Sequence, residues 1–254
     1  MSGSTPLAGK RVVITGGSKG LGRALTEALT GLGAKVCALA RPSSELDEVS
    51  AIDGGWGIPC DLRNSAAIRD AIAKAAEAMG GIDILVNNAG VAAPVPFASV
   101  TDEMIDDQIA INFAAAIHTS RAALPWLLKA QGHVLNVSSE TVHRTSPFLG
   151  VYAGTKAALE RFSLELRDEF RSKKLRVTIL RSGTIATDIS GKWPKEFMDE
   201  FLGLMTRSGY REWSGESVPP ESMAKGIIGV LSMPSDLNLD VVEMRSALPW
   251  FPGE

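Results

Sequence analysis

The sequence predicts an α/β protein with one doubly wound parallel sheet covered by helices on both faces. Short apolar runs alternate with segments of helical spacing along nearly the whole chain. A glycine cluster, TGGSKGLG at residues 15–22, lies between the first apolar run and the first helical segment. With 254 residues, 45% of them hydrophobic, the chain can bury one large core. We therefore expect a single domain over residues 1–254.

The expected elements follow one another in alternation. The expected strands are RVVIT (11–15), KVCALA (35–40), a weaker run at 56–60, IDILVNNAG (82–90), HVLNVSS (133–139), RVTILRSG (176–183) and LDVVEM (239–244). The expected helices span 21–34, 65–80, about 101–131, about 152–171 and about 219–232. Parallel strands need right-handed crossovers, and such sheets bind ligands at the carboxyl ends of their strands.

Composition excludes several classes of partner. The formal net charge of −3 gives no general attraction to nucleic acid or to anionic membranes. No stretch offers 18 consecutive apolar residues, and the first ten residues lack the apolar core of a signal peptide. The two cysteines, Cys37 and Cys60, lie in or beside apolar runs, as buried thiols do. We expect a cytoplasmic protein with no nucleic-acid or membrane partner.

The glycine cluster has the context of a phosphate-binding turn. It follows the first strand and opens the first helix, where free N–H groups can hold a pyrophosphate. Its spacing is TGxxxGxG, formed by Thr15, Gly16, Gly20 and Gly22, and not the commoner GxGxxG. A purely structural turn is the alternative for this motif taken alone.

Seven motifs in order give the chain a family resemblance. Besides TGxxxGxG they are CDL with Asp61, NNAG at 87–90, Asn112, NVSS ending at Ser139, YAGTK at 152–156 and SGTIAT at 182–187. In this order and spacing the chain resembles the single-domain branch of the short-chain dehydrogenase/reductase superfamily. The resemblance implies a Rossmann-like fold, a nicotinamide cofactor and hydride transfer to or from a carbonyl or alcohol.

Four residues are candidates for the chemistry. Tyr152 and Lys156 are four apart on one expected helix, so their side chains share a face, and the ammonium can lower the pKa of the phenol. Tyr152 can then exchange a proton with the substrate oxygen, to which Ser139 can donate a hydrogen bond. The family spacing of 13 residues to the tyrosine favours Ser139 over Ser138. The resemblance implies that Asn112 anchors a water that relays protons through Lys156. A surface helical pair, a helix cap and a backbone-bonded amide are the alternatives for each residue alone.

The second strand points to NADP(H). Members that use NAD have an acidic residue at its end, where this chain has Ala40 followed by Arg41. Arg41 can grip a 2′-phosphate and Lys19 can add a second positive charge; a solvated arginine is the alternative. The resemblance implies these cofactor contacts: Thr15, Gly16, Ser18, Lys19, Gly20, Leu21, Gly22, Arg41, Asp61, Leu62, Asn88, Ala89, Gly90, Tyr152, Lys156, Gly183, Ile185 and Thr187.

The segment at about 185–217 breaks the alternation of strands and helices. It combines glycines with large side chains: Trp193, Phe197, Phe201, Met205, Tyr210 and Trp213. Glycines permit movement, and aromatic and Met side chains form adaptable apolar walls. We expect a lid over an apolar substrate pocket; packing in the core or between subunits is the alternative.

The sequence also departs from the family pattern. Ser182 stands where proline is usual before Gly183, and Glu140 follows Ser139 where a small residue is common. The C-terminal segment lacks the TGQ-like ending of many acyl-carrier-protein reductases and is more similar to the branch of serine and 3-hydroxy acid dehydrogenases.

We therefore expect an NADP(H)-dependent oxidoreductase, a carbonyl reductase or secondary-alcohol dehydrogenase, acting on a small, partly apolar carbonyl or alcohol. A 3-oxoacyl thioester reductase and a non-catalytic NADP-sensing regulator are the alternatives. We expect no metal, because His118, His133 and His143 lack ligand spacing, although His143 lies between Ser139 and Tyr152, within reach of a substrate. The family resemblance implies a homodimer or homotetramer.

Overall fold

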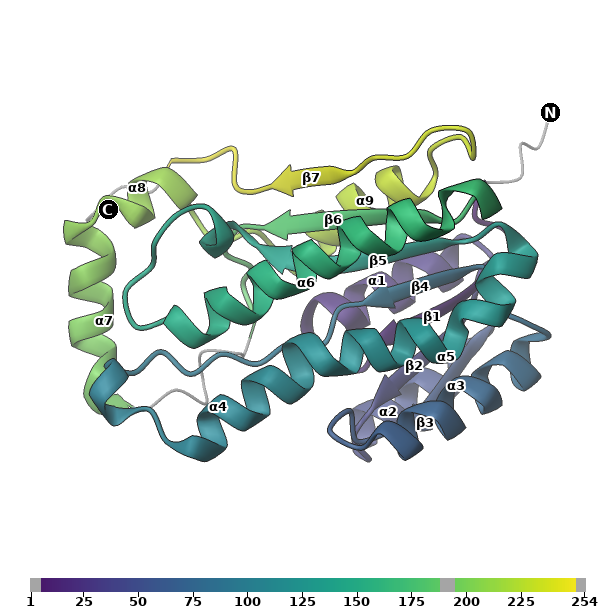
Figure 1. Ribbon diagram of the computed structural model, residues 1–254, viewed down its shortest axis with the longest axis horizontal. Coiled ribbons are helices and arrows are strands. Elements are labelled where there is room, and N and C mark those ends of the chain that lie inside the picture. Colours follow the sequence, from purple (N-terminus) through teal and green to yellow (C-terminus); the bar gives the residue numbers. More distant parts are fainter. Residues whose placement is uncertain (1–5, 188–194, 250–254) are drawn as a thin grey trace.

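Seven strands form one parallel sheet in the computed structural model, in the order β3-β2-β1-β4-β5-β6-β7 (Figure 1). The strands are β1 (Arg11–Thr15), β2 (Lys35–Ala40), β3 (Gly55–Pro59), β4 (Ile84–Asn87), β5 (His133–Ser139), β6 (Arg176–Ser182) and β7 (Val241–Met244). The structure describes residues 6–187 and 195–249. The order reverses between β1 and β4, which is the switch point where sheets of this class bind ligands. The predicted doubly wound fold is confirmed.

Helices cover both faces of the sheet. They are α1 (Gly20–Gly31), α2 (Ser44–Ser50), α3 (Ser65–Met79), α4 (Asp102–Ile109), α5 (Ala115–Ala130), α6 (Gly150–Phe170), α7 (Lys195–Arg207), α8 (Tyr210–Ser214) and α9 (Pro220–Leu231). One core cluster joins the sheet to α3, α5 and α6, and a second joins its other face to α1 and α9. Successive strand residues alternate between the two clusters, as Val12 and Val13 do, because β side chains have period two.

Local chemistry explains where several helices begin and end. Asn64 accepts hydrogen bonds from the first amides of α3, and Gly80, with φ of +78°, ends that helix. Ser43 and Thr101 cap α2 and α4 in the same way. The helix α2 was not among the expected elements, because its seven residues are too short to show a helical period.

The helix expected at 101–131 is interrupted. Between α4 and α5, residues Ala110–Ala114 form a π-helical turn, in which the N–H of Ala115 bonds the carbonyl oxygen of Ala110. Such turns recur at functional sites. The sequence did not predict this π-helical turn, because the apolar residues on either side of it keep the spacing of a continuous helix.

The expected lid segment contains two helices. Figure 1 shows α7 and α8 beyond the carboxyl ends of the strands, set apart from the layers that cover the sheet. Trp193 and residues 188–194 around it lie outside the described residues. Within residues 6–187 and 195–249, no helix is long and apolar enough to cross a bilayer.

Candidate active site

The glycine loop between β1 and α1 leaves amide groups open to an anion. Gly16 and Gly20 have φ of +66° and +52°, a region that favours glycine. A side chain on Gly22 would overlap the carbonyl oxygen of Gly16. Lys19, the N-cap of α1, makes no side-chain capping bond. The first N–H groups of α1 therefore lack a protein cap and can bind the charge of a pyrophosphate.

Polar contacts tie this loop to the NNAG segment after β4. Thr15 Oγ1 accepts hydrogen bonds from the N–H groups of Asn88 at 3.0 Å and Ala89 at 3.1 Å. Asn88 Nδ2 donates to the carbonyl oxygen of Thr15 at 3.0 Å. Leu21 and Leu62, predicted to contact the cofactor nearby, place their side chains in the core, and Ser18 is also buried. The structure thus brings two predicted cofactor segments together at the switch point.

The predicted phosphate-binding cations lie at an exposed end of the sheet. Arg41 follows β2 and is exposed. Lys19 Nζ pairs with Glu45 Oε1 at 2.6 Å, with 65% and 38% of the two side chains exposed. Asp61 pairs with Arg63 at 3.1 Å, and this hydrogen bond holds the pKa of Asp61 below its usual value. Glu45 and Arg63 are neighbours that sequence patterns did not single out.

Tyr152, Lys156 and Ser139 lie together at the carboxyl end of β5. Lys156 is 3% exposed and its Nζ donates to the carbonyl oxygen of Val137 at 2.8 Å, 5.7 Å from the centre of the Tyr152 ring. Ser139 is buried, and its Oγ accepts from Thr141 Oγ1 at 3.0 Å. The first two turns of α6 and the last residue of β5 therefore place a phenol, an ammonium and a hydroxyl beside one another.

Asn112 lies in the π-helical turn and faces the same site. Its Oδ1 accepts from the N–H of Val91 at 2.8 Å, and its Nδ2 donates to Val91 O at 2.9 Å and to Thr155 Oγ1 at 3.1 Å. A Cβ built on Gly90 would lie 3.5 Å from both Asn112 Oδ1 and Lys156 Nζ. Asn112 and Lys156 thus converge on Gly90. Whether Asn112 anchors a water stays a prediction.

Burial governs the proton affinities of the pair. It lowers the pKa of Lys156 to about 8, because the charged form loses hydration. It raises the pKa of Tyr152, an effect that the hydrogen bond with Ser139 opposes and the charge of Glu140 reinforces. In this structure the Lys156 ammonium is directed to the Val137 carbonyl oxygen, and a lowering of the Tyr152 pKa by Lys156 stays a prediction.

The loop after β6 reaches the glycine loop from the other side. Gly183 N donates to Met244 O at 2.8 Å, and Ile185 pairs with Val218 in an isolated bridge. A Cβ on Gly20 would lie 3.1 Å from Thr187 Cγ2, so Thr187 packs against the predicted phosphate-binding turn. Ser182 Oγ, where the family has proline, donates to Ser138 O at 3.4 Å.

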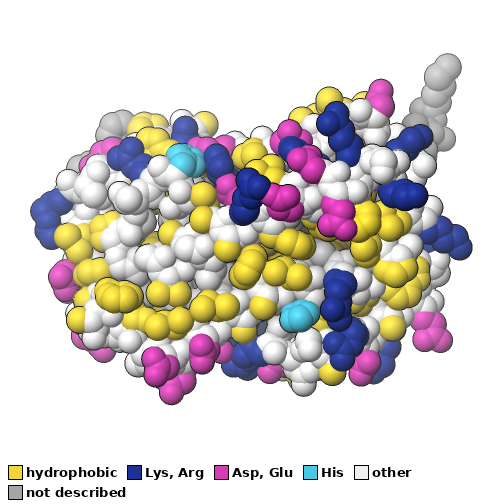
Figure 2. All heavy atoms as spheres, viewed as in Figure 1, with side chains coloured by type: hydrophobic (Ala, Val, Ile, Leu, Met, Phe, Trp, Pro, Cys, Tyr) yellow, Lys and Arg dark blue, Asp and Glu magenta, His cyan; other side chains and the backbone are white. Residues whose placement is uncertain are grey.

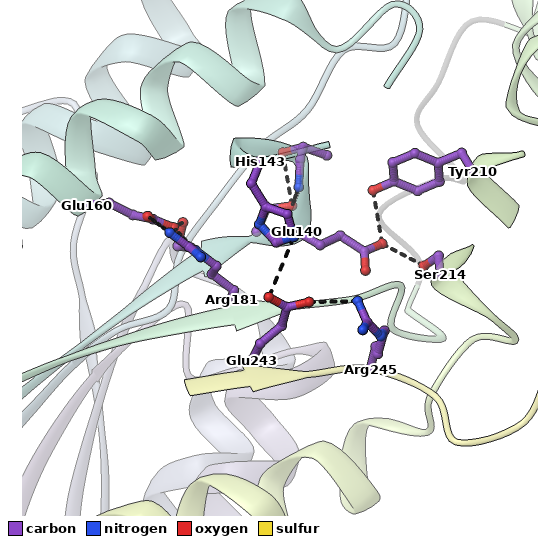
Figure 3. Close-up of polar contacts among 11 residues, drawn as sticks. Glu140, His143, Glu160, Arg181, Tyr210, Ser214, Glu243 and Arg245 are labelled. Carbon is purple, nitrogen blue, oxygen red and sulfur yellow. Dashed lines mark hydrogen bonds and ion pairs between the residues drawn. The ribbon is translucent and has the colours of Figure 1, made fainter. Parts of the chain in front are cut away.

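A partly buried ion pair below the site was not expected from the sequence. Glu160 Oε2 pairs with Arg181 Nη2 at 2.7 Å, and Glu160 Oε1 accepts from Ser138 Oγ at 2.7 Å. These contacts join α6, which carries Tyr152, to β5 and β6 (Figure 3). Two signals could have found them: Glu160 follows Lys156 by four residues, and Arg181 interrupts an apolar strand.

An apolar cavity of about 400 Å³ opens at the N-terminus of α6, the helix that carries Tyr152. Its lining residues come from the segment after β4 and the segment before α6; they are Ala93, Val95, Phe97, Val100, Ser146, Phe148, Gly150 and Val151. Val151 adjoins Tyr152 in the chain. Among the described residues, no group of three or more His, Cys, Asp or Glu side chains is arranged to hold a metal ion.

The sequence and the fold are both similar to those of known short-chain dehydrogenases. Residues 10–197 match the family model for short chain dehydrogenase. A serine 3-dehydrogenase of Rhizobium radiobacter is 31% identical over 257 residues, covering 95% of this chain and 96% of that protein. A closed form of serine dehydrogenase complexed with NADP+ is 28% identical, with a TM-score of 0.81 and coverage of 96% and 98%. A metagenomic short-chain oxidoreductase in complex with NADP is 26% identical, with a TM-score of 0.77 and coverage of 96% and 100%.

Proposed function

Because the chain belongs to the short-chain dehydrogenase family, we propose that Tyr152 exchanges the proton in a reaction between a carbonyl and an alcohol. The protein is an NADP(H)-dependent oxidoreductase acting on CH–OH or C=O groups. Its catalytic residues in this proposal are Asn112, Ser139, Tyr152 and Lys156. The observation that carries the proposal is their convergence at the carboxyl end of β5, with Lys156 Nζ 5.7 Å from the Tyr152 ring.

The protein's own groups supply binding, orientation and proton transfer. NADP(H), when bound, gives or takes the hydride. Tyr152 protonates the carbonyl oxygen in reduction and accepts the alcohol proton in oxidation. Ser139 donates a hydrogen bond to the same oxygen as charge develops on it. The glycine loop fits a pyrophosphate because a side chain on Gly22 would close it.

Preference for NADP(H) over NAD(H) is assigned to the exposed end of β2. Arg41 and Lys19 are the cations that would contact the 2′-phosphate. Two similar structures contain NADP+ or NADP, which supports the same assignment. No acidic side chain ends β2 to accept hydrogen bonds from the ribose.

The substrate is proposed to be a small, partly apolar carbonyl or alcohol, bound in the cavity at the N-terminus of α6 and reaching Tyr152 from there. The decisive experiment is a screen of NADPH oxidation with ketones, aldehydes, diketones and 3-oxo thioesters, together with NADP+ reduction by serine and 3-hydroxy acids. We expect turnover with at least one class and its loss in Tyr152→Phe. Turnover only with 3-oxo thioesters would favour the thioester reductase. NADPH binding without any turnover would favour the sensing regulator.

We also propose that residues 185–217 act as a lid. The described part packs on the segment before α6: the Phe148 and Phe201 rings stack at 6.3 Å, and Ser146 Oγ contacts Met205 Sδ at 3.2 Å. Both Ser146 and Phe148 line the cavity. NADPH plus an apolar substrate analogue should slow proteolysis within this segment. Unchanged proteolysis would contradict the lid.

A homodimer or homotetramer in the cytoplasm completes the proposal. Figure 2 shows hydrophobic side chains gathered over the face formed by α4, α5 and α6. Ile109 on α4 is 45% exposed and Phe97 is 81% exposed. Covering such side chains in a second copy would remove apolar surface from water. Analytical ultracentrifugation tests this, and a monomer at micromolar concentration would contradict it.

A further inference from the structure

Glu140 is a buried carboxylate immediately after Ser139. Only 2% of it is exposed, and its Oε1 accepts hydrogen bonds from Tyr210 OH at 2.9 Å and Ser214 Oγ at 2.5 Å (Figure 3). Its Oε2 is buried and has no hydrogen-bond partner among the described residues. A buried carboxylate is costly unless it is paired, so its presence at this position calls for a compensating role.

Glu160, the other buried carboxylate near the site, shows what full pairing looks like. Both of its oxygens accept hydrogen bonds from the Arg181 guanidinium, and Ser138 Oγ adds a third. Glu140 has no cation within ion-pair distance in the part of the chain that the structure describes. Its hydrogen-bond donors are the hydroxyl groups of α8. The contacts of Glu140 therefore connect it to α8 through hydrogen bonds that its Oε1 accepts, and not to a cation.

The carboxylate lies where three parts of the site meet. Glu140 follows the last residue of β5. Gly183 lies in the loop after β6, and a Cβ built on it would lie 3.1 Å from Glu140 Oε2. Tyr210 and Ser214 bring in α8, and Ser214 Oγ also contacts Thr184 Oγ1 at 3.2 Å. The catalytic strand, the predicted nicotinamide loop and α8 thus share contacts around one side chain.

The remaining contacts of α8 lie mostly at its surface. Trp213 lies between two guanidinium groups, 5.0 Å from Arg144 and 4.5 Å from Arg245, and its ring meets the edge of His143 at 5.5 Å. Arg245 pairs with Glu243, which is also 3.6 Å from His143. Water can replace the contacts of these exposed or half-buried groups, whereas the hydrogen bonds to Glu140 are buried.

We propose that Glu140 is a positioning residue that fixes α8 against the carboxyl end of β5, beside Ser139, and thereby holds this part of the proposed lid in place at the active site. The inference rests on the proposed function and deepens it, because α8 belongs to the proposed lid. Losing the anchor should loosen this part of the lid and weaken substrate binding. Cofactor binding should change less than substrate binding, because Glu140 adjoins Gly183 of the predicted nicotinamide loop but makes no contact with the glycine loop or Arg41 among the described residues.

The charge of Glu140 supplies a second, separable effect. Burial raises the pKa of Tyr152, and the charge of ionised Glu140 raises it further. Other ionisable groups around Glu140 are Tyr210 on α8, Arg245 and Glu243 at the end of β7, and Arg144 and His143 after Ser139. Glu140→Gln keeps an oxygen for Tyr210 and Ser214 but removes the charge. The pH at which carbonyl reduction declines should therefore shift downward in Glu140→Gln.

Three variants separate the anchor from the charge. Glu140→Ala removes both, Glu140→Gln removes the charge, and the double variant Tyr210→Phe/Ser214→Ala removes the donors on α8 while keeping Glu140. Glu27→Gln on the exposed side of α1 is the matched control. We expect Glu140→Ala and the double variant to raise KM about tenfold or more, since hydrogen bonds to a charged group are lost. Both should also accelerate proteolysis within 195–214, while the Kd for NADPH changes less than about threefold.

The results of these experiments separate the anchoring role of Glu140 from the proposed catalytic role of Tyr152. If both anchor variants keep wild-type KM, proteolysis and pH profile, a merely structural role is indicated and the inference is overturned, even if Tm falls. If Glu140→Ala does not fold, the double variant decides the question. If Tyr152→Phe retains full turnover, the proposed catalytic assignment fails whatever Glu140 does. Proteolysis and NADPH binding need no substrate, so they test the anchor if the screen finds none.

Discussion

The two ends of the proposed cofactor site differ in how they hold charge. At the catalytic end, Lys156 and Asn112 are 3% and 1% exposed, and their polar atoms bond to β5, the segment after β4 and α6. At the end of β2, Arg41 is exposed and Lys19 pairs with Glu45 at the surface. The partner of an exposed ion pair is readily replaced by water or by a phosphate. A buried charged or polar group keeps its partners only as long as the elements around it stay packed. Changes at the buried end should therefore alter chemistry and stability, and changes at the exposed end should alter cofactor preference alone.

The largest difference should appear at Tyr152. Tyr152→Phe removes only the hydroxyl that acts on the substrate oxygen, so kcat should fall by about 10²–10⁴-fold. The Kd for NADPH, measured by fluorescence titration, should change little, because the glycine loop is intact. Lys156→Ala should damage both, since Lys156 is proposed to act in proton transfer and also to contact the cofactor. Equal losses of kcat and NADPH affinity in Tyr152→Phe would contradict the separation of roles.

Breaking the partly buried ion pair should have the next largest effect. Arg181→Met leaves Glu160, whose side chain is 9% exposed, without its cation. We expect the free energy of unfolding to fall by about 3 kcal/mol in urea denaturation, the lower end for a buried pair, because the Arg181 side chain is 25% exposed. Glu45→Gln breaks the exposed pair at the other end and should leave the unfolding midpoint unchanged. Similar losses in the two variants would remove the contrast between the ends.

The buried ammonium should make stability depend on pH. Burial lowers the pKa of Lys156 from 10.5 to about 8, so between these values the unfolded chain binds more protons than the folded protein. The contribution of Lys156 to stability should therefore rise with pH across this window, by up to about 3 kcal/mol. The free energy of unfolding, measured in urea without cofactor at pH 7.5, 8.5 and 9.5, should increase with pH in the wild type relative to Lys156→Met. A difference that does not change with pH would show that the ammonium is hydrated.

The smallest of these effects is expected at Arg41. Arg41→Asp removes a charge-assisted hydrogen bond to the 2′-phosphate and adds repulsion, so NADPH binding should weaken at least about tenfold. NADH should be tolerated, and thermal stability should stay as in wild type because the position is exposed. The ratio of kcat/KM for the two cofactors is the measurement. An unchanged ratio would remove Arg41 from the assignment.

Sequence patterns were most informative where structure is local. The strand HVLNVSS was predicted with the observed bounds of β5, because a short run with three β-branched or apolar residues, Val134, Leu135 and Val137, between two helical segments is typical of a buried parallel strand. Tyr152 and Lys156 were placed on one helix face from their spacing alone. The orientation of Lys156 toward Val137 could not be predicted in this way, since it depends on how α6 packs against β5.

By itself the sequence determined the seven strands and their alternation with the main helices, the position of the glycine loop and the family to which the catalytic motifs point. These rest on period, spacing and local propensity, which act over a few residues. Only the tertiary structure decided that Glu160 pairs with Arg181, 21 residues away, and that Glu140 receives hydrogen bonds from Tyr210 and Ser214, 70 and 74 residues away. The physical reason is burial: a carboxylate removed from water must find its donors in whichever elements pack against it, and no local pattern records that choice.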